Sequence, residues 1–202
     1  MNNSMNHLSA IVLAAGLSKR MGKENKLLLP YQERTIIRTV VENILAAGIH
    51  EVLVVVGHEA DKLTAAVSDL PVKMIVNEQY EKGMTTTIQE GVRYATGAGF
   101  MICLSDMVMI TADEYRWMQA EFLRQLSKDA AVICLPHYKN EKGNPVIFSA
   151  AYRNAILQHE AMEGCKEIVQ QNKSHIFWME MTTSHVLQDL DYRQDYEELV
   201  KE

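Results

Sequence analysis

The chain alternates short apolar runs with amphipathic segments, and this alternation constrains its fold more than any other feature. Each of the first four apolar runs is followed by a segment with helical periodicity. Such an order predicts parallel strands joined by right-handed helical crossovers, and hence an α/β fold with a three-layer, mostly parallel sheet. The predicted strand and helix pairs cover residues 8–13 and 35–47, 51–56 and 60–67, 72–76 and 84–95, and 100–104 and 112–126.

The second half of the chain departs from this order. Two strand-like runs at 130–135 and 143–148 flank a polar loop, which predicts an antiparallel excursion at one edge of the sheet. A chain of 202 residues suits one domain, 1–202, better than two. The remaining pattern predicts helices at 150–158, 166–171 and 192–201 and short strands near 176–179 and 185–188.

Composition and charge exclude several classes of protein. Hydrophobic residues make up 48% of the chain and charged residues 23%, which is typical of a globular domain. The net charge of −6 leaves no broad basic surface for nucleic acid, so a phosphate-bearing partner would be small and met by local cations. No apolar run approaches membrane-spanning length and the polar N-terminus is no secretory signal, so we expect no membrane partner and a cytoplasmic location.

The three cysteines indicate neither a disulfide framework nor a zinc site. Cys103, Cys134 and Cys165 are odd in number, far apart and without Cys-x-x-Cys spacing. Cys103 and Cys134 fall inside apolar strand-like runs, so we expect both to be buried as small hydrophobic residues. Reduced thiols are therefore expected.

The most informative motif follows the first predicted strand. Its loop begins with Ala14-Ala15-Gly16, whose small side chains let backbone N–H groups approach an anion closely. Arg20 offers a planar fork and Lys26 a mobile point charge, which suit different phosphates of a triphosphate. The spacing differs from both the P-loop and the Gly-x-Gly-x-x-Gly dinucleotide motif. The alternative interpretation is a plain strand end with a solvated basic edge.

Asp106 is the candidate metal ligand. It comes just after the apolar run 100–104, where a carboxylate is costly unless it is paired or bound to a metal. Mg²⁺ takes one or two protein carboxylates together with phosphate oxygens and water, so one aspartate suffices as its anchor. The alternative role is a helix cap or turn.

At these residues the chain resembles the MobA-like nucleotidyltransferases. Their signature reads Leu-Ala-Ala/Gly-Gly-x-Ser-x-Arg-Met-Gly with a lysine shortly after, and their Gly-Asp-Met-Pro resembles the segment at Asp106. With alanine at position 15, the motif resembles that of the cytidylyl branch of the family. This branch includes molybdenum cofactor cytidylyltransferases and accessory proteins of molybdenum hydroxylases. The resemblance covers nearly the whole chain and implies a Rossmann-like sheet of the nucleotide-diphospho-sugar transferase type.

The resemblance also implies an activity and its residues. It implies a Mg²⁺-dependent transfer from CTP to a phosphate-bearing acceptor, expected to be molybdopterin, with release of pyrophosphate and a molybdenum hydroxylase as client. Residues 7–110 would bind the nucleotide and residues 111–202 the acceptor. Catalytic roles fall on Arg20, Lys26 and Asp106, and metal contacts on Asp106 and Asp191. The implied nucleotide contacts are Leu13, Ala14, Ala15, Gly16, Ser18, Arg20, Lys26, Asn77, Gly83 and Thr87.

Two of these assignments have structural alternatives. Gly83 allows the turn into the predicted helix, while Asn77 and Thr87 offer neutral hydrogen-bonding groups for a base or ribose. The threonines of this segment can instead cap the helix. Asp191, in the family's Asp-x-Asp position, can likewise cap the last helix rather than contact a metal.

The acceptor half matches the family less closely. The run 142–148 resembles a Gly-x-Pro-x-x-Phe signature, which implies acceptor contacts at Gly143, Asn144 and Pro145. The alternative is that Gly143 and Pro145 only shape an edge strand. Lys166 is the fourth implied acceptor contact, and it stands where the family has arginine. Met162 stands where the family has aspartate. Two alternatives therefore stay open: a nucleotidyltransferase acting on a sugar or polyol phosphate, and a non-catalytic chaperone that binds the cofactor.

Overall fold

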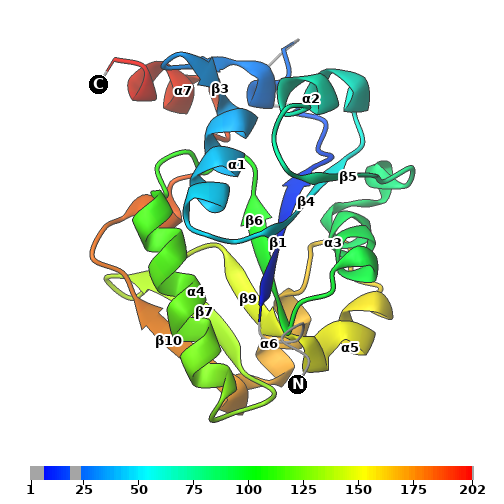
Figure 1. The fold of residues 1–202 in the computed structure, drawn as a ribbon, viewed down its shortest axis with the longest axis vertical. Helices are drawn as coiled ribbons and strands as arrows, with labels where there is room; N and C mark the ends of the chain where they lie inside the picture. Colours follow the sequence, from blue (N-terminus) through cyan, green and yellow to red (C-terminus); the bar gives the residue numbers. More distant parts are fainter. Residues whose placement is uncertain (1–6, 19–23, 202) are drawn as a thin grey trace.

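The structure is a computed structural model that describes residues 7–18 and 24–201. Its main sheet has eight strands, with the order β10-β7-β9-β6-β1-β4-β5 and with β8 paired to β7 (Figure 1). A separate antiparallel pair joins β2 (Pro30–Tyr31) to β3 (Arg34–Thr35). The strands of the main sheet are β1 (Leu8–Ala14), β4 (Glu51–Val56), β5 (Lys73–Val76), β6 (Gly99–Leu104), β7 (Ile133–Tyr138), β8 (Glu141–Lys142), β9 (Val146–Ser149) and β10 (Ile176–Glu180).

Helices cover both faces of this sheet and complete three layers. The helices are α1 (Ile36–Ala46), α2 (Ala60–Ala66), α3 (Met84–Tyr94), α4 (Ala112–Leu126), α5 (Arg153–Leu157), α6 (Lys166–Gln171) and α7 (Arg193–Leu199). Buried side chains of α1, α2 and α4 share one hydrophobic cluster, and those of α3 and α6 share a second one. In the described part of the chain no helix combines the length and apolarity needed to cross a bilayer.

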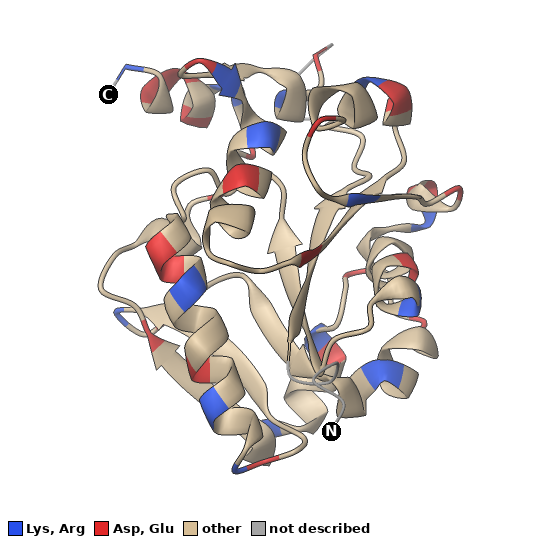
Figure 2. Ribbon diagram, viewed as in Figure 1, with Lys and Arg blue, Asp and Glu red and all other residues tan. Residues whose placement is uncertain are grey.

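The central strand β1 shows why this sequence forms two cores. Its side chains alternate, so that Ala10 and Val12 join the cluster under α1 while Ile11 joins the cluster under α3. Gly91 lets α3 come close to this strand, because a Cβ there would lie 2.2 Å from Ile11 Cγ2. Figure 2 shows acidic and basic residues distributed together over the helices, whereas the strands are mostly uncharged.

The antiparallel excursion is confirmed, and its position in the sheet is now defined. Strand β9 runs antiparallel to both β6 and β7, and it lies between them. Strand β10, which pairs in parallel with β7, forms the edge.

One predicted strand is wrong. Residues 185–188 form no strand, because His185–Leu187 is a short 3₁₀ helix closed by local hydrogen bonds. The Gln188 N–H donates to the His185 carbonyl at 3.2 Å, so this backbone pairs with its own turn rather than with the sheet. The buried Val186 gives the segment the apolar pattern that resembles a strand.

Candidate functional site

A cavity of about 550 Å³ opens where β1 and β6 end. This is the end of the sheet at which the loops after parallel strands collect, as expected for a ligand site in such folds. Most of the predicted nucleotide and metal residues line it together. They are Leu13, Ala15, Gly16, Ser18, Lys26, Gly83, Thr87, Asp106 and Asp191.

The loop after β1 leaves open space beside its backbone. A Cβ added at Gly16 would have no heavy atom of the described residues within 4 Å, and Gly16 faces the cavity. Ser18 adopts a left-handed conformation with φ of 49°, and its hydroxyl donates to Asn25 Oδ1 at 3.4 Å. Ala14 is buried and is not among the cavity residues, and Arg20 lies outside the described residues. The loop is therefore shaped to admit an anion near Gly16.

Lys26 begins a short 3₁₀ helix, Lys26–Leu28, whose cap residue Asn25 accepts from the Leu27 N–H at 3.1 Å. Its ammonium donates to Asp106 Oδ2 at 2.5 Å and to the Leu190 carbonyl at 2.8 Å. It also lies 3.6 Å from Asp191 Oδ1. One cation thus joins residues from three distant parts of the chain.

Asp106 and Asp191, the two carboxylates that the resemblance implies as metal contacts, both lie near the Lys26 ammonium. Asp106 is only 7% exposed, and the neighbouring Ser105 hydroxyl donates to the Leu13 carbonyl at 2.6 Å, which ties this loop to β1. A third aspartate, Asp189, lines the cavity as well. Burial raises the pKa of Asp189, and the negative charges of Asp106 and Asp191 raise it further.

These carboxylates could supply one or two ligands to a divalent cation, but not a complete protein coordination shell. Crowding of negative charge around a single lysine favours an additional cation. Among the described residues, however, no three His, Cys, Asp or Glu side chains are placed to hold one ion together. An ion would therefore take one or two of these carboxylates and complete its shell with phosphate and water, which is the usual coordination of Mg²⁺.

Asn77 does not line the cavity, and its side chain instead forms hydrogen bonds that hold the start of α3. It is 2% exposed, and its amide donates to the hydroxyls of Thr86 and Thr87 at 3.0 Å each. Its Oδ1 accepts from the Gln79 N–H at 2.9 Å. Asn77 therefore fixes the entry to α3, and Thr87 on that helix reaches the cavity.

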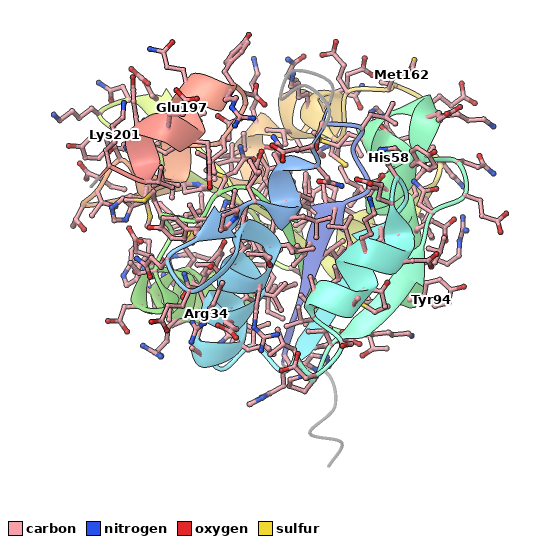
Figure 3. The ribbon with its side chains drawn as sticks, turned by 90° about the horizontal axis from the view of Figure 1, so that it is seen from above. Arg34, His58, Tyr94, Met162, Glu197 and Lys201 are labelled. Carbon is pink, nitrogen blue, oxygen red and sulfur yellow. The ribbon has the colours of Figure 1, made fainter. Side chains whose placement is uncertain are left out.

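Gly83 lies where two segments meet at the cavity wall. Its φ is +107°, and a Cβ there would lie 2.7 Å from the Met162 carbonyl oxygen. In Figure 3 the molecule is seen from the end at which β1 and β6 finish, and Met162 is labelled on this packed segment. Only glycine permits both this φ and this approach.

Several cavity residues were not predicted as site residues. Tyr80, Glu81 and Met84 belong to the same segment as Gly83, so its loop-to-helix pattern pointed to the right place but not to these side chains. Asp189 was visible as the first half of the Asp-x-Asp pattern. The additional lining residues are Leu17, Leu27, Tyr80, Glu81, Met84, Leu104, Ser105 and Asp189.

The predicted acceptor residues lie outside this cavity. Gly143 is buried, and a Cβ there would lie 2.5 Å from the Val186 carbonyl oxygen. The Asn144 N–H donates to that same carbonyl at 2.9 Å, and the Asn144–Pro145 bond is cis. Lys166 begins α6 and lies 3.3 Å from Glu163 on the exposed surface.

Comparison with known proteins decides the family. Residues 10–176 match the MobA-like NTP transferase domain. The chain belongs to the MobA-like NTP transferase family. The predicted family and the predicted enzyme class are therefore confirmed, and the chain is a nucleotidyltransferase related to molybdenum cofactor cytidylyltransferases and guanylyltransferases.

Two curated relatives illustrate the range of this family. The chain is 36% identical over 151 residues to the nicotine blue oxidoreductase of Paenarthrobacter nicotinovorans, which covers 74% of each protein. It is 23% identical over 193 residues to the molybdenum cofactor cytidylyltransferase of Escherichia coli K12, which covers 95% of each.

Solved structures with the same architecture confirm the predicted fold class. Rv0371c of Mycobacterium tuberculosis H37Rv superposes with a TM-score of 0.86 at 22% identity and 100% coverage of both chains. A manganese complex of the same protein superposes with a TM-score of 0.76 at 20% identity, covering 96% of this chain and 98% of the other. The shared fold is the nucleotide-diphospho-sugar transferase type.

Proposed function

We propose that this protein is a CTP:molybdopterin cytidylyltransferase that uses Mg²⁺, releases pyrophosphate and acts in the cytoplasm in the maturation of a molybdenum hydroxylase. The observation that carries the proposal is the shared ammonium of Lys26, which contacts Asp106 and Asp191 beside the open loop at Gly16. A polyanion and a cation together would satisfy this set of charges.

Asp106 and Asp191 are the residues that would hold Mg²⁺ in this proposal, with Asp189 beside them. The bound ion would supply positive charge that offsets the charge developing on the departing pyrophosphate. The crowded carboxylates described above support this assignment, since their mutual repulsion is relieved by a cation.

The chain's own residues would position the nucleotide. Backbone N–H groups of the loop at Gly16 would hold the phosphates, and Arg20 and Lys26 would add charge. Lys26 carries a flexible side chain, so its ammonium can transfer from Asp106 to a phosphate oxygen when the nucleotide enters. Alignment of the acceptor oxygen with the α-phosphorus then becomes the main task of the site.

The acceptor needs no dedicated general base. A phosphate monoester has a second pKa of about 6 and is mostly dianionic at neutral pH. The lining formed by the described residues contains no histidine, which agrees with this chemistry. Ala15 is the basis for naming CTP as the nucleotide. In this proposal residues 7–110 bind the nucleotide and residues 111–202 bind the acceptor. The acceptor contacts would be Gly143, Asn144, Pro145 and Lys166.

Pyrophosphate release tests the proposal. The purified protein with CTP, Mg²⁺ and molybdopterin should release pyrophosphate, and Lys26→Ala should lower the rate by about 10²–10³-fold, as expected for one well-placed donor. Lys62→Ala is the control, because Lys62 is exposed and lies outside the cavity. Wild-type rates in Lys26→Ala would refute the assigned role.

The same assay separates the two alternatives. Release only with sugar or polyol phosphates would identify the related transferase. Binding of molybdopterin without pyrophosphate release from any nucleotide would favour the non-catalytic chaperone.

A further inference from the structure

The segment 181–191 delivers Asp189 and Asp191 to the cavity, yet its only regular structure is the 3₁₀ helix His185–Leu187. It leaves β10 with the Met181 N–H donating to the His137 carbonyl at 2.8 Å. At its far end, Lys26 donates to the Leu190 carbonyl at 2.8 Å. Because Lys26 is also a proposed phosphate ligand, the segment needs other anchors that remain when Lys26 changes partner. One is the Asn144 N–H, which donates to the Val186 carbonyl at 2.9 Å.

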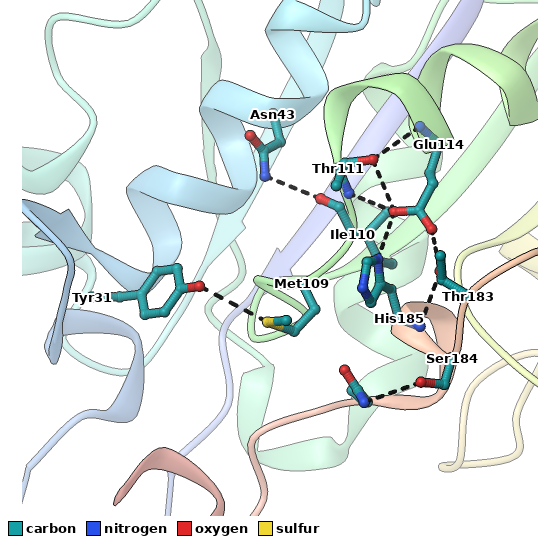
Figure 4. A network of polar contacts seen from close by, with 10 residues as sticks. Tyr31, Asn43, Met109, Ile110, Thr111, Glu114, Thr183, Ser184 and His185 are labelled. Carbon is teal, nitrogen blue, oxygen red and sulfur yellow. Dashed lines mark hydrogen bonds and ion pairs between the residues drawn. The ribbon is translucent and has the colours of Figure 1, made fainter. Parts of the chain in front are cut away.

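Glu114, in the first turn of α4, provides such an anchor. Its Oε1 accepts from the Thr183 hydroxyl at 2.5 Å, and its Oε2 lies 3.0 Å from His185 Nδ1, which must donate to an acceptor-only carboxylate (Figure 4). The Glu114 side chain is 13% exposed and that of His185 is 25% exposed. We name this set of contacts among Glu114, Thr183 and His185 the Glu114 clasp.

The clasp relates the segment directly to Asp106. Asp106 and Glu114 stand at the two ends of one connection, the turn from β6 into α4. Thr111 stiffens this turn, since its N–H donates to Glu114 Oε2 at 2.8 Å and its hydroxyl caps the helix. A segment fixed to Glu114 is therefore fixed relative to Asp106.

We propose that Glu114 is a positioning residue for the carboxylates of this site. Glu114 acts through Thr183 and His185 and holds the segment 181–191. The segment then keeps Asp189 and Asp191 near Asp106 even when Lys26 has moved to a phosphate. The inference rests on the proposed function, because it assigns the clasp a purpose in binding a metal nucleotide. Such indirect partners of metal ligands commonly affect metal affinity by 10–100-fold.

Two matched substitutions separate this role from general stability. Thr183→Val removes one bond of the clasp and leaves the helix cap. Thr111→Val removes the capping hydroxyl together with its 2.9 Å hydrogen bond to Glu114 Oε2, and it leaves the contacts of Glu114 with Thr183 and His185 in place. Mn²⁺ with CTP serves as the probe, and electron paramagnetic resonance of free Mn²⁺ gives the apparent Kd. Hydrogen exchange of the backbone amides at 187–191 reports the order of the segment without any ligand.

Thr183→Val should raise the apparent Kd for Mn²⁺ about tenfold and speed exchange at 187–191. Thr111→Val should lower the melting temperature by about 2–4 °C while Kd and this exchange stay within twofold of wild type. If Thr183→Val folds poorly, Glu114→Gln is the second variant, and it should weaken Mn²⁺ binding in the same direction.

Two results would overturn the proposal: unchanged Mn²⁺ affinity and exchange in Thr183→Val, or an equal loss of affinity in Thr111→Val. Failure of the proposed function is distinguishable, because wild type would then bind no Mn²⁺ with CTP. In that case, unchanged hydrogen exchange at 187–191 in Thr183→Val would still show that the Glu114 clasp does not hold this segment in place.

Discussion

Gly16 and Lys26 show how much a single residue can specify at this site. Both were predicted from local sequence, because a small residue and a cation next to a buried strand are recognisable without the fold. The sequence analysis predicted none of the contacts that the Lys26 side chain makes. Lys26 contacts Asp106 across 80 positions and Leu190 across 164, and no local pattern encodes which distant backbone carbonyl meets its ammonium.

Gly143 illustrates the converse at the residue scale. The sequence motif predicted acceptor contact, whereas the structure gives a packing reason for glycine, since Val186 leaves no room for a Cβ. The same residue type therefore marks open space at position 16 and the absence of space at position 143. Only the fold distinguishes the two.

Gly16→Ala tests whether the open space belongs to the nucleotide. Because none of the residues that the structure describes lies within 4 Å of the added Cβ, and because the φ of Gly16 is not in the left-handed region, the free energy of unfolding should change by less than about 1 kcal/mol. The KM for CTP should rise at least tenfold, since the methyl group would lie where phosphate approaches the backbone. Urea denaturation and pyrophosphate release measure the two effects.

Gly143→Ala is the comparison for that measurement. Its Cβ meets backbone at 2.5 Å, so it should lose about 1–3 kcal/mol of stability, as overpacked sites do. A Gly16→Ala protein that is equally destabilised, or that binds CTP as wild type does, would contradict the assignment.

At the scale of elements, the sequence predicted the repeating strand and helix pairs well because each one carries its own periodicity. Strands β1, β4, β5 and β6 and helices α1 to α4 lie within two residues of their predicted bounds. The prediction failed at 185–188. The buried Val186 gives this segment an apolar pattern like that of a strand, but its backbone forms the local hydrogen bonds of a 3₁₀ helix. The insertion of β9 between β6 and β7 depends on pairing that no single segment encodes.

Glu51, at the start of β4, links elements at the end of the sheet opposite the cavity. Burial alone would raise its pKa, but hydrogen bonds from Ser9, from Thr96 and from His7 lower the pKa below its ordinary value. The ionised carboxylate therefore contributes stability above the unfolded pKa of about 4.3, and this stability is lost as pH falls through the lower folded pKa.

Glu51→Gln should accordingly lower the free energy of unfolding by about 1 kcal/mol at pH 7, and the difference from wild type should narrow below about pH 4. Urea denaturation between pH 3 and pH 7 measures it. Glu163→Gln, at an 81% exposed side chain, is the control and should stay within about 0.5 kcal/mol of wild type. A difference that stays constant over this range would refute the hydrogen-bond argument.

At the scale of the whole molecule, parallel strands explain why the site could be predicted at all. Loops after β1, β5 and β6 meet at one end of the sheet, so residues far apart in sequence gather there. The path of the chain from the end of the edge strand β10 across to the cavity is not visible in any local pattern. Asp189 and Asp191 reach the cavity by this path, and the Glu114 clasp was found only in the structure.

The central claim is that the cavity between Gly16, Lys26 and Asp106 receives a metal nucleotide. A crystal structure with CTP and Mg²⁺ tests it most directly. We expect the triphosphate along the loop at Gly16, the Lys26 ammonium on a phosphate oxygen, and the ion on Asp106 or Asp191. A nucleotide bound elsewhere, with Lys26 still 2.5 Å from Asp106, would contradict the claim.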